Sequence, residues 1–174
     1  MGKFIESTLW CIGYFFLSSI LIGSFVFGLL NIGIEATFSE ETIKNLVQTI
    51  IETIVIGVIL YIFMRINGHK GNITAFSGKV TVKDMLIPII ISVLLFQTLS
   101  LLNDIDIRVN LPSEYYLFSA NKQDALASLL PQFILQSAAY ALFMIFGYNA
   151  GYKKYDKERT EMMSKKMSIR ADCQ

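Results

Sequence analysis

Charged residues are scarce in this chain, and their scarcity excludes whole classes of protein. Only 17% of the 174 residues are charged, 53% are hydrophobic, and the mean hydropathy is +0.52. A soluble helical bundle needs a polar face on each helix, yet the tracts 20–30 and 54–64 are apolar nearly all the way round. A formal net charge of +1 without dense Lys/Arg runs argues against bulk nucleic-acid binding. We therefore expect a membrane protein that has no nucleic acid among its partners.

Residues suited to catalysis or cross-linking are also few. The two cysteines, Cys11 and Cys173, both fall on the side assigned below to the cytoplasm, where thiols stay reduced, so we expect no disulfide. The single histidine, His69, has glycine and lysine as neighbours, and we interpret it as a surface residue. One imidazole and two distant thiols offer no metal-ligand spacing, so we expect no metal and no cofactor.

Long uncharged tracts are what the chain has instead. Residues 9–34, 85–103 and 125–152 carry no charge, and residues 45–64 carry one, Glu52. A tract of roughly 18 or more such residues is long enough to cross the hydrocarbon layer as a helix. The first tract exceeds the apolar region of a signal peptide, so we interpret it as a retained anchor.

These tracts predict an all-α integral membrane protein, a four-transmembrane-helix bundle within residues 1–152, followed by a basic tail at 153–174. The predicted spans are about 9–31, 44–64, 85–103 and 125–148.

The distribution of Lys and Arg predicts the orientation of the bundle. All of them except Lys44, Arg108 and Lys122 lie before the first span, between the second and third, or in the tail. Because cytoplasmic loops collect Lys and Arg, both termini are expected on the cytoplasmic side of the cell membrane. Membrane lipids are expected among the partners of the protein. The cytoplasmic loop 67–83 has two short β-favouring runs around Ser77-Gly78, which indicate either a small hairpin or a plain connecting loop.

A cluster of polar residues is expected inside the membrane, around Glu52. The depth of each residue along its span, at 1.5 Å per residue, places the members of this cluster in one layer of the outer half of the bilayer. They are Glu52, Gln48, Gln97, Gln132 and Gln136. Three interpretations remain open: amides that shield a buried carboxyl, a transport site for a proton or cation, or a lateral contact with a basic group of a partner protein.

Small residues recur at a spacing that lets helices approach closely. The first span has Ser19/Gly23 and Ser24/Gly28, and the inner end of the fourth has Gly147/Gly151. Such small-xxx-small steps favour helix packing, within the chain or between copies.

Two Asn-x-x-Asp patterns lie at the expected outer membrane face. Asn103 precedes Asp106 at the end of the third span, and Asn121 precedes Asp124 at the start of the fourth. The pattern weakly resembles lipoprotein signal peptidases, which are four-span enzymes with inward termini. The resemblance implies an aspartyl protease in which Asp106 and Asp124 activate water. The sequence departs from that family at Arg108, which stands one place late.

The function that these features favour is non-enzymatic. We expect a packing, accessory or regulatory subunit that associates with another membrane protein or with itself as a homo-oligomer. The first alternative is a proton- or cation-coupled transporter or channel subunit that uses Glu52. The second is the aspartyl protease with Asp106 and Asp124 as its catalytic residues.

Overall fold

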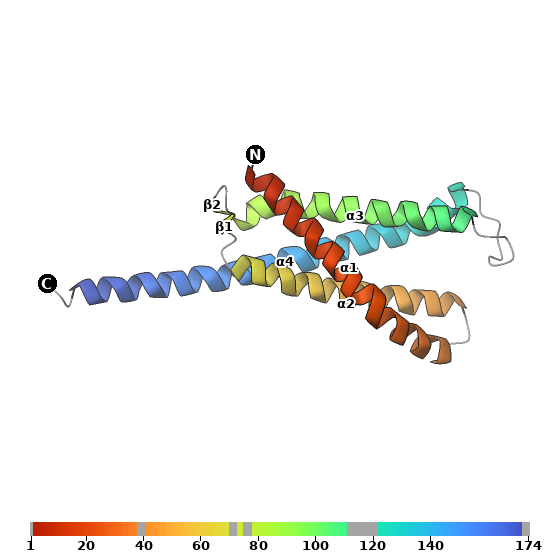
Figure 1. Cartoon of the computed structure of the whole chain (residues 1–174), viewed down its shortest axis with the longest axis horizontal. Coiled ribbons are helices and arrows are strands. Elements are labelled where there is room, and N and C mark those ends of the chain that lie inside the picture. Colours follow the sequence, from red (N-terminus) through yellow and green to blue (C-terminus); the bar gives the residue numbers. More distant parts are fainter. Residues whose placement is uncertain (1, 38–40, 70–72, 75–77, 111–121, 172–174) are drawn as a thin grey trace.

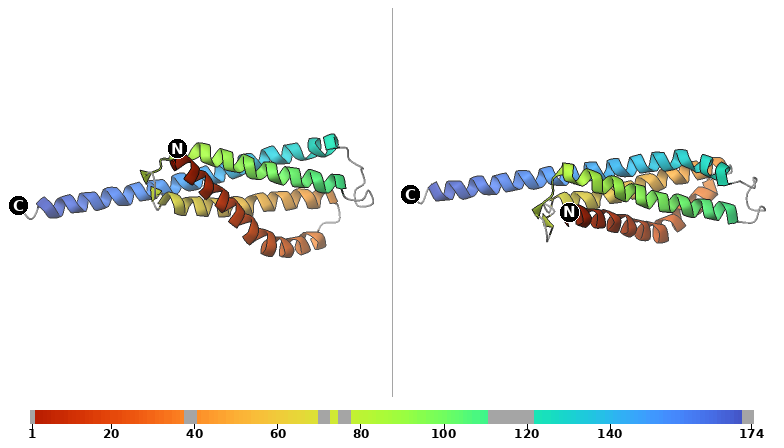
Figure 2. Two further views of the ribbon diagram at one scale, coloured as in Figure 1. Left: turned by 45° about the horizontal axis from the view of Figure 1, so that its top comes forward. Right: turned by 90° about the horizontal axis from the view of Figure 1, so that it is seen from above.

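The chain folds into four α-helices in a computed structural model that describes residues 2–37, 41–69, 73–74, 78–110 and 122–171. The helices are α1 (Gly2–Thr37), α2 (Glu41–His69), α3 (Val82–Asn110) and α4 (Lys122–Ala171). Figure 1 shows α2, α3 and α4 running alongside one another, whereas α1 crosses them diagonally. The further views in Figure 2 show the same arrangement, and α1 packs against both α2 and α3.

Three of these helices are long and apolar enough to cross a membrane. The qualifying segments are Leu46–His69, Val82–Leu102 and Leu129–Lys165. In α1 the described apolar segment is the shorter Phe4–Ile20. The middle of α1 lies outside the described side chains, so its role as a span stays a prediction.

A small hairpin connects α2 to α3. Strand β1 (Ile73–Thr74) pairs antiparallel with β2 (Gly78–Lys79), with Ile73 opposite Lys79 and Thr74 opposite Gly78. The structure thus forms the hairpin and not the plain loop. We call this end of the bundle the hairpin end, and the opposite end, where α1 meets α2 and α3 meets α4 along the chain, the loop end.

A side-chain cap starts α3 directly after the hairpin. The Asp84 carboxylate accepts hydrogen bonds from the Thr81 backbone N–H at 3.0 Å and from its hydroxyl at 2.8 Å. The Asp84 N–H in turn donates to the Thr81 hydroxyl oxygen at 3.3 Å. This reciprocal arrangement satisfies donors that the first turn of a helix otherwise leaves unpaired.

The apolar core lies toward the hairpin end, where all four helices contribute. Phe15 of α1 stacks on Phe96 of α3, with ring centroids 5.0 Å apart, and meets the edge of Tyr140 of α4 at 5.8 Å. The Tyr148 hydroxyl donates to the Val80 carbonyl at 2.9 Å and so joins α4 to the hairpin connection. The core also contains the fully buried side chains of Cys11, Leu60, Met64, Val80, Met85, Ile89, Val93 and Met144.

The longest of the described elements is α4, a helix of 50 residues. It continues past the end of the predicted fourth span and projects beyond the other helices at the hairpin end (Figure 1). We call residues 153–171 the α4 extension.

Candidate functional site

Helix α2 contributes polar residues to the site from neighbouring turns of the half that lies toward the loop end. Gln48 and Glu52 are both partly exposed, one turn apart. Thr53 follows directly, and its hydroxyl donates to the Thr49 carbonyl at 2.7 Å. That bond holds the Thr53 oxygen in place as an acceptor for a group on another helix.

The group that uses this acceptor is Gln136 of α4. Its side-chain N–H donates to the Thr53 hydroxyl oxygen at 3.3 Å, and Gln136 itself is only 9% exposed. One turn further along α4, the Tyr140 hydroxyl lies close to Thr53 and within electrostatic range of the Glu52 carboxyl. Glu52, Thr53, Gln136 and Tyr140 therefore form a polar link between α2 and α4.

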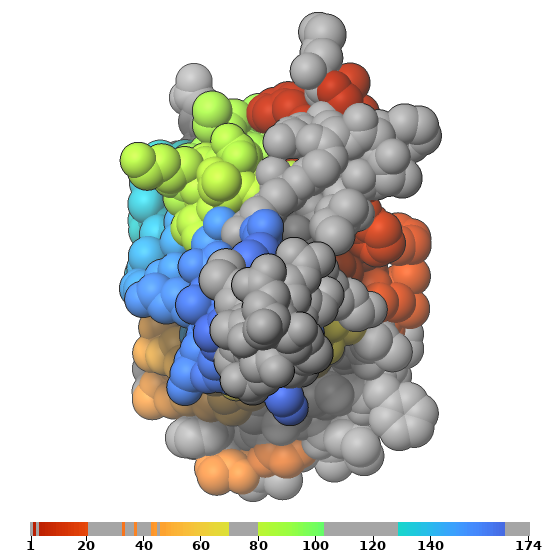
Figure 3. Space-filling view, turned by 90° about the vertical axis from the view of Figure 1, so that its left-hand side faces the viewer, coloured from red at the N-terminus to blue at the C-terminus, as the bar shows by residue number. Residues whose placement is uncertain are grey.

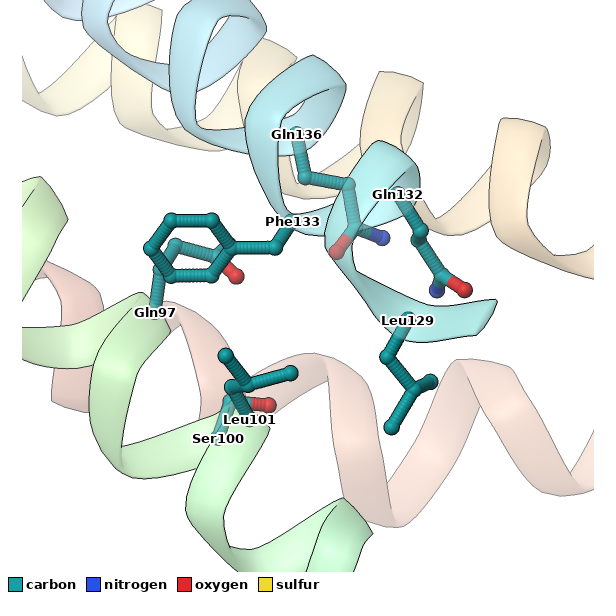
Figure 4. Close-up of a pocket in the computed structure, with 7 residues that line it drawn as sticks. All are labelled: Gln97, Ser100, Leu101, Leu129, Gln132, Phe133 and Gln136. Atoms are coloured by element: carbon teal, nitrogen blue, oxygen red, sulfur yellow. The ribbon is translucent and has the colours of Figure 1, made fainter. Parts of the chain in front are cut away.

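A pocket between α3 and α4 borders the other side of Gln136. It is small, with room for no more than about one water molecule. Figure 4 shows side chains from both helices converging on it: Gln97, Ser100 and Leu101 of α3, and Leu129, Gln132, Phe133 and Gln136 of α4. We call it the amide pocket, because Gln97, Gln132 and Gln136 supply most of its polar groups.

The structure divides the predicted polar cluster into two parts. Gln97, Gln132 and Gln136 share the amide pocket, and Gln97 is 5% exposed there. Glu52 lies outside that pocket, on the α2 side of Gln136, and Gln48 does not line the pocket either. Gln136 lines the pocket and, through its hydrogen bond to Thr53, also joins α4 to α2 beside Glu52.

Two residues of this site were missed in the sequence. Tyr140 stands four residues after Gln136, which itself follows Gln132 by four, so an extension of the same i, i+4 row would have included it. Thr53 gave no comparable signal, because a threonine within a helix can bond its own i−4 carbonyl and needs no partner on another helix.

The glycines of the fourth predicted span lie against α2. A Cβ added at Gly147 would overlap the backbone of Tyr61, and one added at Gly151 would overlap the backbone of Arg65. From the other side, a Cβ at Gly68 of α2 would meet the backbone of Tyr148. These helices therefore approach each other as closely as their backbones allow. In the first span, Ser19 is partly buried, and Gly23, Ser24 and Gly28 lie outside the described side chains.

The aspartate pair stands on helical backbone at the loop end. Asp106 belongs to α3 and Asp124 to α4, and both side chains lie outside the described ones, as does Asn103. Asn121 precedes the first described residue of α4. The protease hypothesis therefore stays a prediction.

His69 has a specific partner that its interpretation as a plain surface histidine did not include. Its Nε2 lies 3.0 Å from Glu158 Oε2 in the α4 extension, and both side chains are about 40% exposed (38% and 44%). Lys154 approaches the same carboxylate at 4.0 Å, at the i, i+4 spacing. The pair exists because α4 continues as a helix past the end of α2.

Within the described part of the chain, no group of three or more His, Cys, Asp or Glu is arranged to hold a metal ion. Comparisons with protein-family models, curated proteins and solved structures give no match.

The chemistry available at the site is limited and clear. The amides of Gln97, Gln132 and Gln136 can both donate and accept hydrogen bonds, and the Glu52 carboxyl can hold or release a proton. Such an arrangement suits a buried polar contact between helices.

Proposed function

We propose that this protein is a non-catalytic subunit of a cell-membrane complex or homo-oligomer, built as a four-span bundle with both termini in the cytoplasm. The position of the Lys and Arg residues supports this topology, because the hairpin and the α4 extension carry most of them. In this role the bundle anchors the protein, and the α4 extension contacts the other subunit.

The α4 extension is the observation that carries this proposal. It reaches about 28 Å past Tyr152 at 1.5 Å per residue. Met162 and Met163 are 60% and 46% exposed on it. These side chains offer apolar contact area on a charged helix, and methionine adapts readily to different partners.

Mass measurement in nanodiscs tests the subunit role. We expect a defined oligomer or a stoichiometric partner, and we expect Met162→Ser/Met163→Ser to weaken that association by tenfold or more. Thr160→Ser, on the same exposed stretch, is the control and should leave it intact. A monomer that retains no partner in nanodiscs made directly from the native membrane would overturn the proposal.

Proton- or cation-coupled transport is the second candidate, because Gln136 joins the amide pocket to Thr53, the residue that follows Glu52 on α2. An acidic residue within a membrane span is costly and commonly functional. Glu52→Gln keeps the shape of the side chain but removes the titrating group. Under this hypothesis it abolishes pH-dependent solute flux into proteoliposomes, while Thr98→Ala, at an exposed position of α3 outside the pocket lining, preserves it. Unchanged flux in the Glu52 variant would remove the hypothesis.

A further inference from the structure

Exposed cations gather around the hairpin end of the bundle, and they come from three helices. We call this set the basic collar: Arg65 of α2, Lys83 of α3, and Lys153, Lys154 and Lys157 of α4. Figure 3 looks onto this end of the molecule, with α4 directed toward the viewer and the start of α3 beside it.

Backbone contacts place the members of the collar at one level. Gly151 packs on the backbone of Arg65, which sets the α2 member beside the start of the α4 members. The Tyr148 hydroxyl binds the Val80 carbonyl, and this sets the beginning of α3, and with it Lys83, against the same turn of α4. The collar is therefore a patch that spans three helices and not a run along one.

Two acidic groups at this level are engaged within the protein, and a third, Asp156, lies exposed among the lysines of α4. Asp84 caps α3 through Thr81, and Glu158 is bound by His69. Lys154 and Lys157 do approach Glu158 and Glu161, at 4.0 and 3.9 Å. Exposed i, i+4 pairs of this kind are weak, so they leave the lysines available to a stronger anion.

Distance along α4 separates the collar from the cations farther out. Tyr152 stacks on Tyr148 at the end of the bundle, at 6.3 Å between ring centroids, and tyrosines favour the membrane–water interface. Lys153, Lys154 and Lys157 lie within about 8 Å of Tyr152 along the helix axis, whereas Lys165 lies about 20 Å away. The Debye length is about 8 Å at physiological salt, so only the nearer lysines experience the potential of the membrane surface.

We propose that the basic collar binds the headgroups of anionic phospholipids in the adjacent leaflet. This inference rests on the four-span topology proposed above and adds a specific lipid partner to it. The collar matches this partner because its cations stand at headgroup height, around the circumference where lipids surround the bundle. Each lysine near an anionic surface is worth roughly fivefold in affinity.

Native mass spectrometry of the full chain released from nanodiscs tests the collar. The nanodiscs contain phosphatidylcholine and phosphatidylglycerol, and the measured quantity is the phosphatidylglycerol retained per protein. Lys153→Gln/Lys154→Gln/Lys157→Gln should lower its retention by tenfold or more. The control Lys165→Gln/Lys166→Gln/Arg170→Gln removes the same charge farther along α4 and should change it less than twofold.

Equal losses in the two triple variants would overturn the proposal, because they would show a response to net charge alone. Equal retention of phosphatidylcholine and phosphatidylglycerol by the unmodified chain would overturn it as well. The topology is read separately, from maleimide labelling of Lys157→Cys in a Cys173→Ser background. Labelling from the outside of intact cells would contradict the four-span orientation, whatever the lipid result.

Discussion

The two halves of the bundle are held together by different means. Toward the hairpin end, Gly147 and Gly151 let α4 meet α2 backbone to backbone, and a buried apolar core fills the remaining space. Toward the loop end, Gln97 and Gln136 are among the buried residues and surround a pocket. Close packing fixes one arrangement of helices, whereas side-chain amides can exchange partners. The half of the bundle toward the hairpin end (the hairpin half) is thus the rigid part. The half toward the loop end (the loop half) is the part that can accommodate a polar group.

Substitution of Gly151 should produce the largest effect. Gly151→Val places side-chain atoms inside the backbone of Arg65, so α2 and α4 must separate. We expect a loss of at least about 3 kcal/mol of unfolding free energy, above the usual range for overpacking, because backbone cannot move aside as a side chain does. Unfolding of the micelle-embedded chain by SDS measures it.

Gly13→Val is the matched control, since nothing lies within 4 Å of a Cβ at Gly13. Its effect should stay below about 1 kcal/mol, the scale of helix-propensity changes. Similar losses at the two glycines would contradict the close-contact account of the hairpin half.

Loss of the Tyr148 hydroxyl should rank second. Tyr148→Phe leaves the buried Val80 carbonyl without this donor, at a cost of about 1–3 kcal/mol. Tyr61→Phe removes a hydroxyl from a partly exposed ring on α2 and should cost much less. Hydrogen exchange of the hairpin amides provides a second readout, and unchanged protection in Tyr148→Phe would show that this bond does not hold the hairpin.

A substitution in the loop half should cost less. Gln136→Leu removes the hydrogen bond to Thr53, and interhelical bonds of this type in membranes average about 0.6 kcal/mol. The variant should therefore fold and lose well under half of what Gly151→Val loses. Gln132→Leu is the control, because Gln132 lines the same pocket but is partly exposed. A loss as large as that at Gly151 would erase the contrast between the halves.

The smallest effect is expected at the boundary between bundle and extension. His69→Ala removes the contact between His69 and Glu158. Both of these side chains are substantially exposed, so the loss of unfolding free energy should be below about 1 kcal/mol. Lys157→Ala, which breaks the 3.9 Å pair with Glu161 within the extension, is the comparison. We expect His69→Ala to loosen the attachment of the α4 extension to α2. A spin label at residue 163 should therefore report greater mobility in His69→Ala than in Lys157→Ala.

Much of the fold was predictable because it depends on local composition. The three confirmed long apolar helices follow from tracts with at most one charge, and the two β-favouring runs around Ser77-Gly78 indicated the hairpin as one of two possibilities. The site was less predictable. The layer of glutamines was inferred from depth alone, and depth does not distinguish the α3 face of Gln136 from its α2 face. For that reason Thr53 and Tyr140 were missed, and Glu52 was expected among amides that line a different space.

By itself, the sequence determined the solvent of this protein and the helical state of its long tracts, because a backbone in lipid must satisfy its own hydrogen bonds. Tertiary structure alone decided which faces meet. A helix that is apolar all round carries no periodic sign of its buried side. Only packing could place Gly151 on the backbone of Arg65, Gln136 against Thr53, and His69 beside Glu158.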